Sequence, residues 1–159
     1  MLRGGEACGL LIFGVVLAGF LLLFLASRPR PANEAAIVAR LRAALTACPS
    51  LAQGHPEVAE VLRAWPVEPL KRGISHTRHD DQRIRLVVLD RRGEPYDDAT
   101  LTHALLHEAL HAARGEGTPE QAHDAAFMQQ LDALLAAAAR DGAVDPLVQP
   151  DTLYPAHIL

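Results

Sequence analysis

The chain has 159 residues and a formal net charge of −4 with histidine neutral. This length suits one modest domain, and the charge excludes a global basic field that would draw the protein to nucleic acid, so nucleic acid is not an expected partner. Two cysteines, Cys8 and Cys48, are too few for a disulfide framework or a cysteine-rich zinc site.

A long apolar segment follows a short N-terminal tail, residues 1–8. Residues 9–26 contain no charge. A helix over them would span roughly 27 Å at about 1.5 Å per residue, which is close to the thickness of a bilayer core. A cleaved signal peptide is the competing interpretation, but Phe24 and Leu25 place bulky residues where a cleavage site needs small ones. We therefore expect a transmembrane anchor.

Flanking charges indicate the orientation of a single-pass protein. Arg3 precedes the apolar segment, and a larger group of arginines follows it: Arg28, Arg30, Arg40 and Arg42. Positive charge favours the cytoplasmic side, and an unpaired Cys48 fits a reducing compartment. We expect a stiff polar linker over residues 27–33, which contain Ser-Arg-Pro-Arg-Pro, and a cytoplasmic domain over residues 34–159.

The patterning of residues 34–159 predicts a small α+β domain. Asn33 can cap a helix over Glu34–Ala47, which Pro49–Gly54 is expected to break. The remaining expected elements, in order, are a helix over Pro56–Ala64, strands over Gly73–Arg78 and Arg83–Asp90, and helices over Asp98–Arg114 and Pro119–Asp141. The last helix carries an apolar stripe that includes Phe127, Leu131, Leu134 and Leu135.

The charged residues around the strands predict an ordinary surface. Arginines there could form a basic stripe, but acidic residues are interspersed with them, so a mixed solvated face is favoured. His76 and His79 lie in or beside turns, where histidines are usually solvated and not metal ligands. The strand Arg83–Asp90 could pair with an extended peptide if it lies at a sheet edge.

The strongest functional signal lies in Leu101–Arg114, which contains the pattern H-E-x-x-H as His107, Glu108 and His111. Residues four apart on a helix project from the same face, so two imidazoles can grip one zinc ion (Zn²⁺). Glu108 lies one step round the helix and can reach a metal-bound water. A histidine-rich core helix without metal is the alternative.

A third ligand must come from elsewhere, because a catalytic zinc takes three protein ligands and keeps one position open. His123 is preferred, since it lies near the start of the next expected helix, which a short loop can return across the first. Asp124, Glu116 and Glu120 stay open as alternatives. His103 lies one turn before His107, too far along a straight helix to share the ion with both other histidines.

The segment from Leu86 to Leu135 resembles the WLM group of metallopeptidase domains, relatives of SprT-like proteases, and is especially similar to short membrane-anchored members from large DNA viruses. The resemblance rests on a strand and an R-x-x-G-x-x-Y-D-like turn before H-E-x-x-H, and on H-x-x-x-F at His123 and Phe127. It departs from the group in a longer second-to-third histidine spacing and in Ala109, where a bulky apolar residue is usual.

This resemblance implies a zincin-like fold, zinc on His107, His111 and His123, and Glu108 as general base. The expected function is a membrane-tethered zinc metallopeptidase that hydrolyses a protein or peptide substrate with a Glu-assisted, zinc-bound water. The alternative is a non-catalytic, membrane-anchored interaction module whose zinc site is structural or decayed, since a motif alone does not guarantee turnover.

Overall fold

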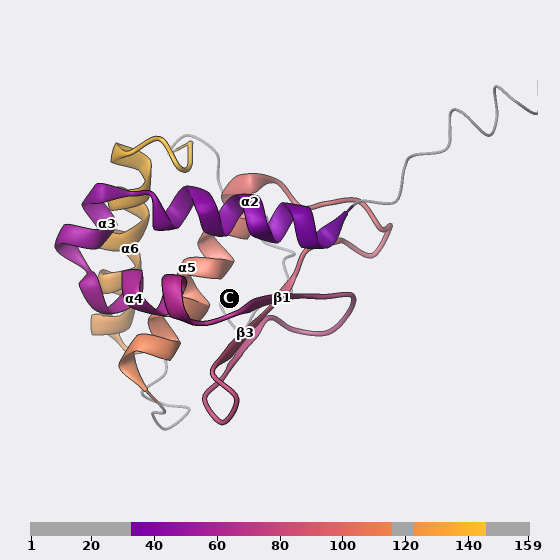
Figure 1. The fold of residues 1–159 in the computed structure, drawn as a ribbon, viewed down its shortest axis with the longest axis horizontal. Helices are drawn as coiled ribbons and strands as arrows, with labels where there is room; N and C mark the ends of the chain where they lie inside the picture. The colour runs from indigo at the N-terminus through magenta and orange to yellow at the C-terminus, as the bar shows by residue number, and fades with distance from the viewer. Residues whose placement is uncertain (1–32, 116–122, 146–159) are drawn as a thin grey trace, which may run out of the picture. The chain divides into compact units, whose positions relative to one another are not determined.

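The computed structural model describes residues 33–115 and 123–145 (Figure 1). The expected tail and anchor, residues 1–8 and 9–26, and nearly all of the linker lie outside the described residues, as do 116–122 and 146–159. Within the part that is described, no helix combines the length and the apolar character needed to cross a membrane.

The described residues form five helices and three strands, which confirms the expected mixed α+β class. The elements, in chain order, are α2 (Glu34–Thr46), α3 (Pro49–Gly54), α4 (Pro56–Ala64), β1 (Val67–Leu70), β2 (His76–Arg78), β3 (Arg83–Val87), α5 (Asp98–Arg114) and α6 (Ala125–Arg140). The predicted start of the last helix at Pro119 is wrong, because residues 123 and 124 are not helical and Asp124 caps α6.

The sheet has the strand order β1-β3-β2. Strand β3 is central: β1 pairs with it in parallel, with Val67 opposite Ile84, and β2 pairs antiparallel, with Thr77 opposite Ile84. Sequence analysis missed β1, whose Pro69 cannot donate a ladder hydrogen bond and is tolerated because β1 is an edge strand. The idea that β3 could be an edge is therefore wrong, and the edge beside α5 belongs to β2.

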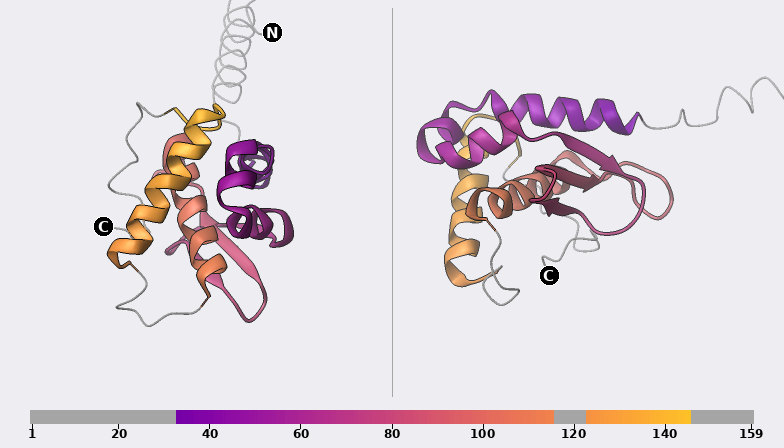
Figure 2. Two further views of the ribbon diagram at one scale, coloured as in Figure 1. Left: turned by 90° about the vertical axis from the view of Figure 1, so that its left-hand side faces the viewer. Right: turned by 60° about the horizontal axis from the view of Figure 1, so that its bottom comes forward.

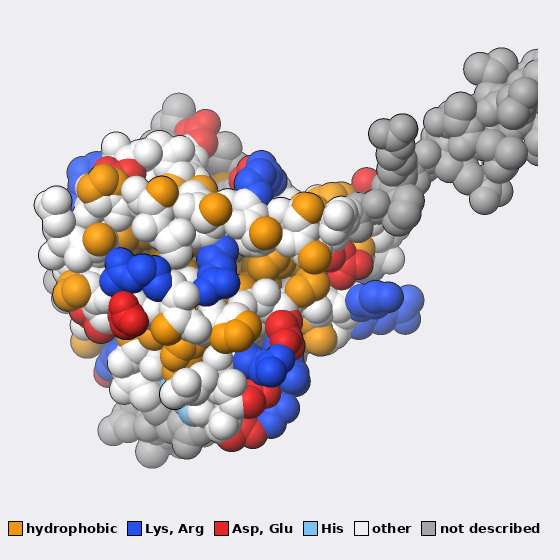
Figure 3. Space-filling view, viewed as in Figure 1, with side chains coloured by type: hydrophobic (Ala, Val, Ile, Leu, Met, Phe, Trp, Pro, Cys, Tyr) orange, Lys and Arg blue, Asp and Glu red, His pale blue; other side chains and the backbone are white. Residues whose placement is uncertain are grey.

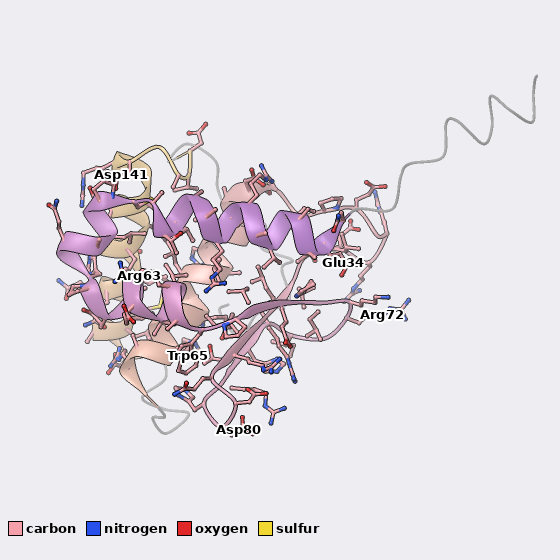
Figure 4. The ribbon with its side chains drawn as sticks, in the orientation of Figure 1. Glu34, Arg63, Trp65, Arg72, Asp80 and Asp141 are labelled. Carbon is pink, nitrogen blue, oxygen red and sulfur yellow. The ribbon has the colours of Figure 1, made fainter. Side chains whose placement is uncertain are left out.

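Residues 49–54 form the helix α3 instead of the expected break. The cause is a distant cap: the Ser50 backbone N–H donates to Asp141 Oδ2 at 2.8 Å, and the Ser50 hydroxyl donates to Oδ1 at 2.9 Å. Asp141 directly follows α6, and Figure 4 shows it beside α3. The Asp141 carboxylate thus accepts hydrogen bonds in the first turn of α3, where the N-cap residue Cys48 makes no side-chain capping bond.

Helix α5 lies at the centre of the domain, in contact with α4, α6, β2 and β3. Its leucines pack into the core, with Leu101, Leu105, Leu106 and Leu110 all buried. Figure 2 shows α6 lying alongside α5. Because α5 touches both the sheet and α6, side chains on its different faces can meet residues from either neighbour.

The strands carry the mixed surface that the sequence predicts. Arg83 pairs with Glu68, and Arg85 lies 3.8 Å from Asp81 and 3.7 Å from Glu68. Figure 3 shows basic and acidic side chains interspersed in this region. The ion pairs are partly exposed, so they contribute little stability, and they leave no basic stripe on the strands.

Candidate metal centre

Helix α5 places the two histidines of the H-E-x-x-H pattern on one face. The Asp97 carboxylate accepts a hydrogen bond of 2.7 Å from the Thr100 backbone N–H and starts the helix. The helix ends before Gly115, whose φ of 78° a residue with a side chain rarely adopts. His107 and His111 lie between these ends, one turn apart, so their rings project in the same direction.

The structure brings His123 to the same point. The Nε2 atom of His111 lies 2.9 Å from that of His107 and 3.2 Å from that of His123, and the third side of the triangle, His107 to His123, is 3.1 Å. His107 is almost fully buried, with 1% of its surface exposed, and the other two rings are half-buried. The three rings therefore face a common centre at the edge of the core.

This triangle fits a bound metal ion. Two nitrogens in a tetrahedral site with metal–nitrogen bonds of 2.0–2.1 Å lie about 3.3 Å apart, slightly more than the three separations found here. A ring N–H can point toward only one of its neighbours, so hydrogen bonds among three imidazoles do not account for three short separations. An ion coordinated by all three rings would account for them, and the group could hold one.

Phe127 supports all three rings from α6. Its ring centroid lies 4.9 Å from that of His107, 4.5 Å from that of His111 and 5.2 Å from that of His123. The Phe127 side chain is 1% exposed, so it keeps water away from that side of the three histidines. Phe127 was expected in the apolar stripe of the last helix and, from the resemblance, in the H-x-x-x-F element that His123 opens, but its contacts with all three imidazoles were not predicted.

His123 is held by the ends of two helices. The next residue, Asp124, caps α6 by accepting a 2.7 Å hydrogen bond from the Phe127 backbone N–H, and it faces Arg114 at 3.3 Å. The Phe127 N–H, and then Arg114, lower the pKa of the Asp124 carboxyl. Asp124 therefore acts as a cap outside the histidine group, while Glu116 and Glu120 lie outside the described residues.

Glu108 is a buried carboxyl, 4% exposed, directed toward the edge strand β2. The Thr77 hydroxyl lies 3.0 Å from Glu108 Oε2 and 2.7 Å from the Glu108 carbonyl oxygen. Burial raises the pKa of Glu108 to about 7, and hydrogen bonds from the Thr77 hydroxyl and backbone N–H oppose that rise. Sequence analysis missed Thr77, because no local pattern links residues 31 positions apart.

His76, His79 and His103 lie outside the group, and His76 and His79, which were expected to be solvated, are half-buried. His103 is half-buried, and desolvation lowers its pKa against the opposing effect of Asp132. His76 contacts the Ile74 carbonyl oxygen at 2.9 Å, and His79 meets the Trp65 ring edge-on at 5.7 Å, with Trp65 labelled in Figure 4. The contacts of His76 and His79 thus lie within the strands and their neighbourhood, away from the three-histidine group.

The chain was also compared with models of protein families, with curated proteins and with solved structures. No match was found in any of the three comparisons. The parts of the candidate site are three converging imidazoles, a buried carboxyl on the same helix as two of them, and a neighbouring sheet edge.

Proposed function

We propose that this protein is a membrane-tethered, zinc-dependent peptidase with a zincin-like catalytic domain. The observation that carries the proposal is the convergence of His107, His111 and His123 at Nε2 separations of 2.9–3.2 Å, with Glu108 buried beside the first of them. Three ligands with one open position are typical of catalytic zinc, whereas structural zinc sites are usually closed by four.

The donor set favours zinc over the common hard cations. Mg²⁺ and Ca²⁺ prefer oxygen ligands, and the group consists of three imidazole nitrogens. Zinc accepts nitrogen in a tetrahedral arrangement, which matches the spacing of the three Nε2 atoms. A zinc ion held there supplies a Lewis acid that polarises a carbonyl and makes water more acidic.

The residues of the chain supply the proton transfers. Glu108 accepts a proton from the attacking water and passes it to the leaving nitrogen of the cleaved peptide bond. Its buried position suits this role, because burial raises the pKa of Glu108 to about 7 in the metal-free chain, so that the carboxyl can both accept and release a proton near neutral pH. Phe127 excludes water from behind the three imidazoles and holds their orientation.

A protein or peptide is the substrate that this arrangement suits. Strand β2 is an edge of the sheet, and its central residue, Thr77, contacts Glu108. An extended peptide that runs along this side of the domain would carry its own carbonyl groups past the site. The apolar segment 9–26 and the linker 27–33 would tether the domain to a membrane, on the cytoplasmic side by the arginine count.

The test uses the full chain, purified in detergent, with fluorescently labelled casein as an unfolded protein substrate. We expect about one zinc per chain, by analogy with single-zinc sites, and hydrolysis that a chelator abolishes. Glu108→Gln should keep the zinc and lose hydrolysis, while Glu57→Gln, an exposed change on α4, should behave as the parent. Hydrolysis by Glu108→Gln at the parent rate would overturn the mechanism, and zinc binding without any parent hydrolysis would support a non-catalytic module.

A further inference from the structure

Thr77 forms a bridge between the sheet and the candidate base. It lies in the middle of the three-residue strand β2, and its hydroxyl contacts both the main chain and the side chain of Glu108, at 2.7 Å and 3.0 Å. The Thr77 backbone N–H also acts on the Glu108 carboxyl. One residue of the edge strand thus contacts both the main chain and the carboxylate of Glu108.

We propose that Thr77 is the positioning residue for Glu108 and fixes the carboxylate in the orientation needed for proton transfer. The proposal rests on the peptidase function argued above. Helix α5 determines where the Glu108 backbone lies, but a glutamate side chain has three rotatable bonds, so the helix alone does not determine where its carboxylate points. A donor from a second element removes that freedom.

The donor is itself held firmly. Thr77 pairs with Ile84 of the central strand, and Ile84 is completely buried. Two residues before Thr77, the Ser75 hydroxyl accepts a hydrogen bond of 2.8 Å from the Val87 backbone N–H, which ties the entry to β2 to the end of β3. The hydroxyl therefore reaches Glu108 from a part of the fold anchored by both backbone pairing and burial.

The chemistry of threonine offers a matched pair of variants. Thr77→Val keeps the branched shape and the strand preference but removes the hydroxyl, whereas Thr77→Ser keeps the hydroxyl and removes a methyl group. Thr46 provides the control, because its hydroxyl donates to the Arg42 carbonyl oxygen at 2.8 Å on the separate helix α2. Thr46→Val removes a comparable hydrogen bond away from the site.

The first measurement is steady-state hydrolysis of labelled casein by the full chain in detergent, with zinc content determined for every variant. Loss of one hydrogen bond to a charged group predicts a fall in kcat of about tenfold for Thr77→Val, with KM and zinc content close to the parent. Thr77→Ser should restore kcat to within about threefold, since it keeps the donor. Thr46→Val should leave kcat unchanged.

The second measurement needs no activity. The denaturation midpoint of the metal-free chain is compared for the parent, Thr77→Val, Glu108→Ala and the double variant. If Thr77 holds the carboxylate, Thr77→Val should shift the midpoint less in the Glu108→Ala background than in the parent, because one of its partners is already gone. If the Thr77 hydroxyl bound only the main-chain carbonyl of residue 108, Thr77→Val would shift the midpoint equally in both backgrounds.

The outcomes separate the two proposals. The role of Thr77 would be overturned if Thr77→Val kept the parental kcat while Glu108→Gln was inactive. Equal midpoint shifts in the two backgrounds would overturn it as well. Either result would leave the peptidase function standing. An active Glu108→Gln would instead overturn the role of Glu108 as the base, and the role of Thr77 in catalysis with it. A parent chain that binds zinc and does not hydrolyse casein would overturn the peptidase function itself. Failure of Thr77→Ser to recover activity would show that the methyl group, and not the hydroxyl, matters.

Discussion

The guanidinium of Arg114 lies 3.3 Å and 3.4 Å from the two carboxylate oxygens of Asp124. Arg114 ends α5, and Asp124 caps α6, so this pair joins the helices on either side of residues 115–123. Arg114 also lies over the Phe127 ring, 5.5 Å from its centroid. The contacts bring the start of α6, and His123 with it, against the end of α5.

Breaking this pair should loosen the metal site only slightly. Both side chains are partly exposed, at 32% and 42%, and exposed ion pairs contribute little free energy. We expect Arg114→Gln to weaken zinc binding by at most about fivefold, measured by competition with a chromogenic chelator at low salt. High salt should shrink the difference between this variant and the parent.

Asp124 allows the ion pair to be separated from the helix cap. Asp124→Asn keeps a good capping residue, so it should match Arg114→Gln. Asp124→Ala also removes the hydrogen bond to the Phe127 backbone N–H and should weaken zinc binding further. Equal zinc affinities for Asp124→Asn and Asp124→Ala would show that the cap does not position His123.

Removing His123 should have a far larger effect than removing another histidine of the same region. His123→Ala deletes one of the three nitrogen ligands. Loss of a residue that only supports a ligand costs about 10–100-fold in metal affinity, so we expect loss of a ligand itself to weaken zinc binding on the order of 100-fold or more. His103→Ala is the control, since His103 lies outside the group. Parental zinc affinity in His123→Ala would contradict the three-histidine site.

The parts of the fold that sequence analysis predicted well are those with local causes. The bounds of α5 follow from Asp97 at its start, Gly115 after its end and leucines on its buried face. His107 and His111 share a face because they lie on one helix, four residues apart. Local spacing is enough to predict such features, whatever surrounds them.

The parts that were missed depend on contacts between distant residues. Helix α3 is capped by Asp141, which lies 91 positions from Ser50, and β1 forms by parallel pairing with β3 in spite of its proline. The contact between Thr77 and Glu108 likewise requires the β2 edge to lie against α5. Backbone pairing and tertiary capping outweigh local propensity in these places, and one sequence does not reveal them.

The pKa of Glu108 predicts how the metal-free protein responds to pH. The pKa rises from 4.5 to about 7 on folding, so the unfolded chain ionises first, and stability should fall as pH rises between these values and then level off. This difference in pKa corresponds to a contribution of roughly 3 kcal/mol to the unfolding free energy. A glutamine at position 108 does not titrate. With the metal removed by a chelator, the unfolding free energy of Glu108→Gln should therefore exceed that of the parent, and the difference should grow from pH 5 to pH 8.

Chemical denaturation at the two pH values measures this difference. Glutamine can still accept from the Thr77 hydroxyl, so the variant changes the charge and keeps the hydrogen bond. Glu57→Gln, on the exposed face of α4, is the matched control and should track the parent at both pH values. A stability gain of Glu108→Gln that is the same at pH 5 and pH 8 would show that the buried charge is not its cause.

Phe127 should affect metal binding beyond its effect on stability. It is buried against all three imidazoles, so Phe127→Leu should cost about 1–2 kcal/mol in unfolding free energy and also let the rings turn, which should weaken zinc binding by about tenfold. Leu134→Ala, two turns further along the buried face of α6, should cost about 2–5 kcal/mol and leave zinc affinity near the parent value. Chelator competition and denaturation on the same samples decide the matter. If zinc affinity in these two variants simply follows their unfolding free energy, the Phe127 ring has no specific part in holding the metal.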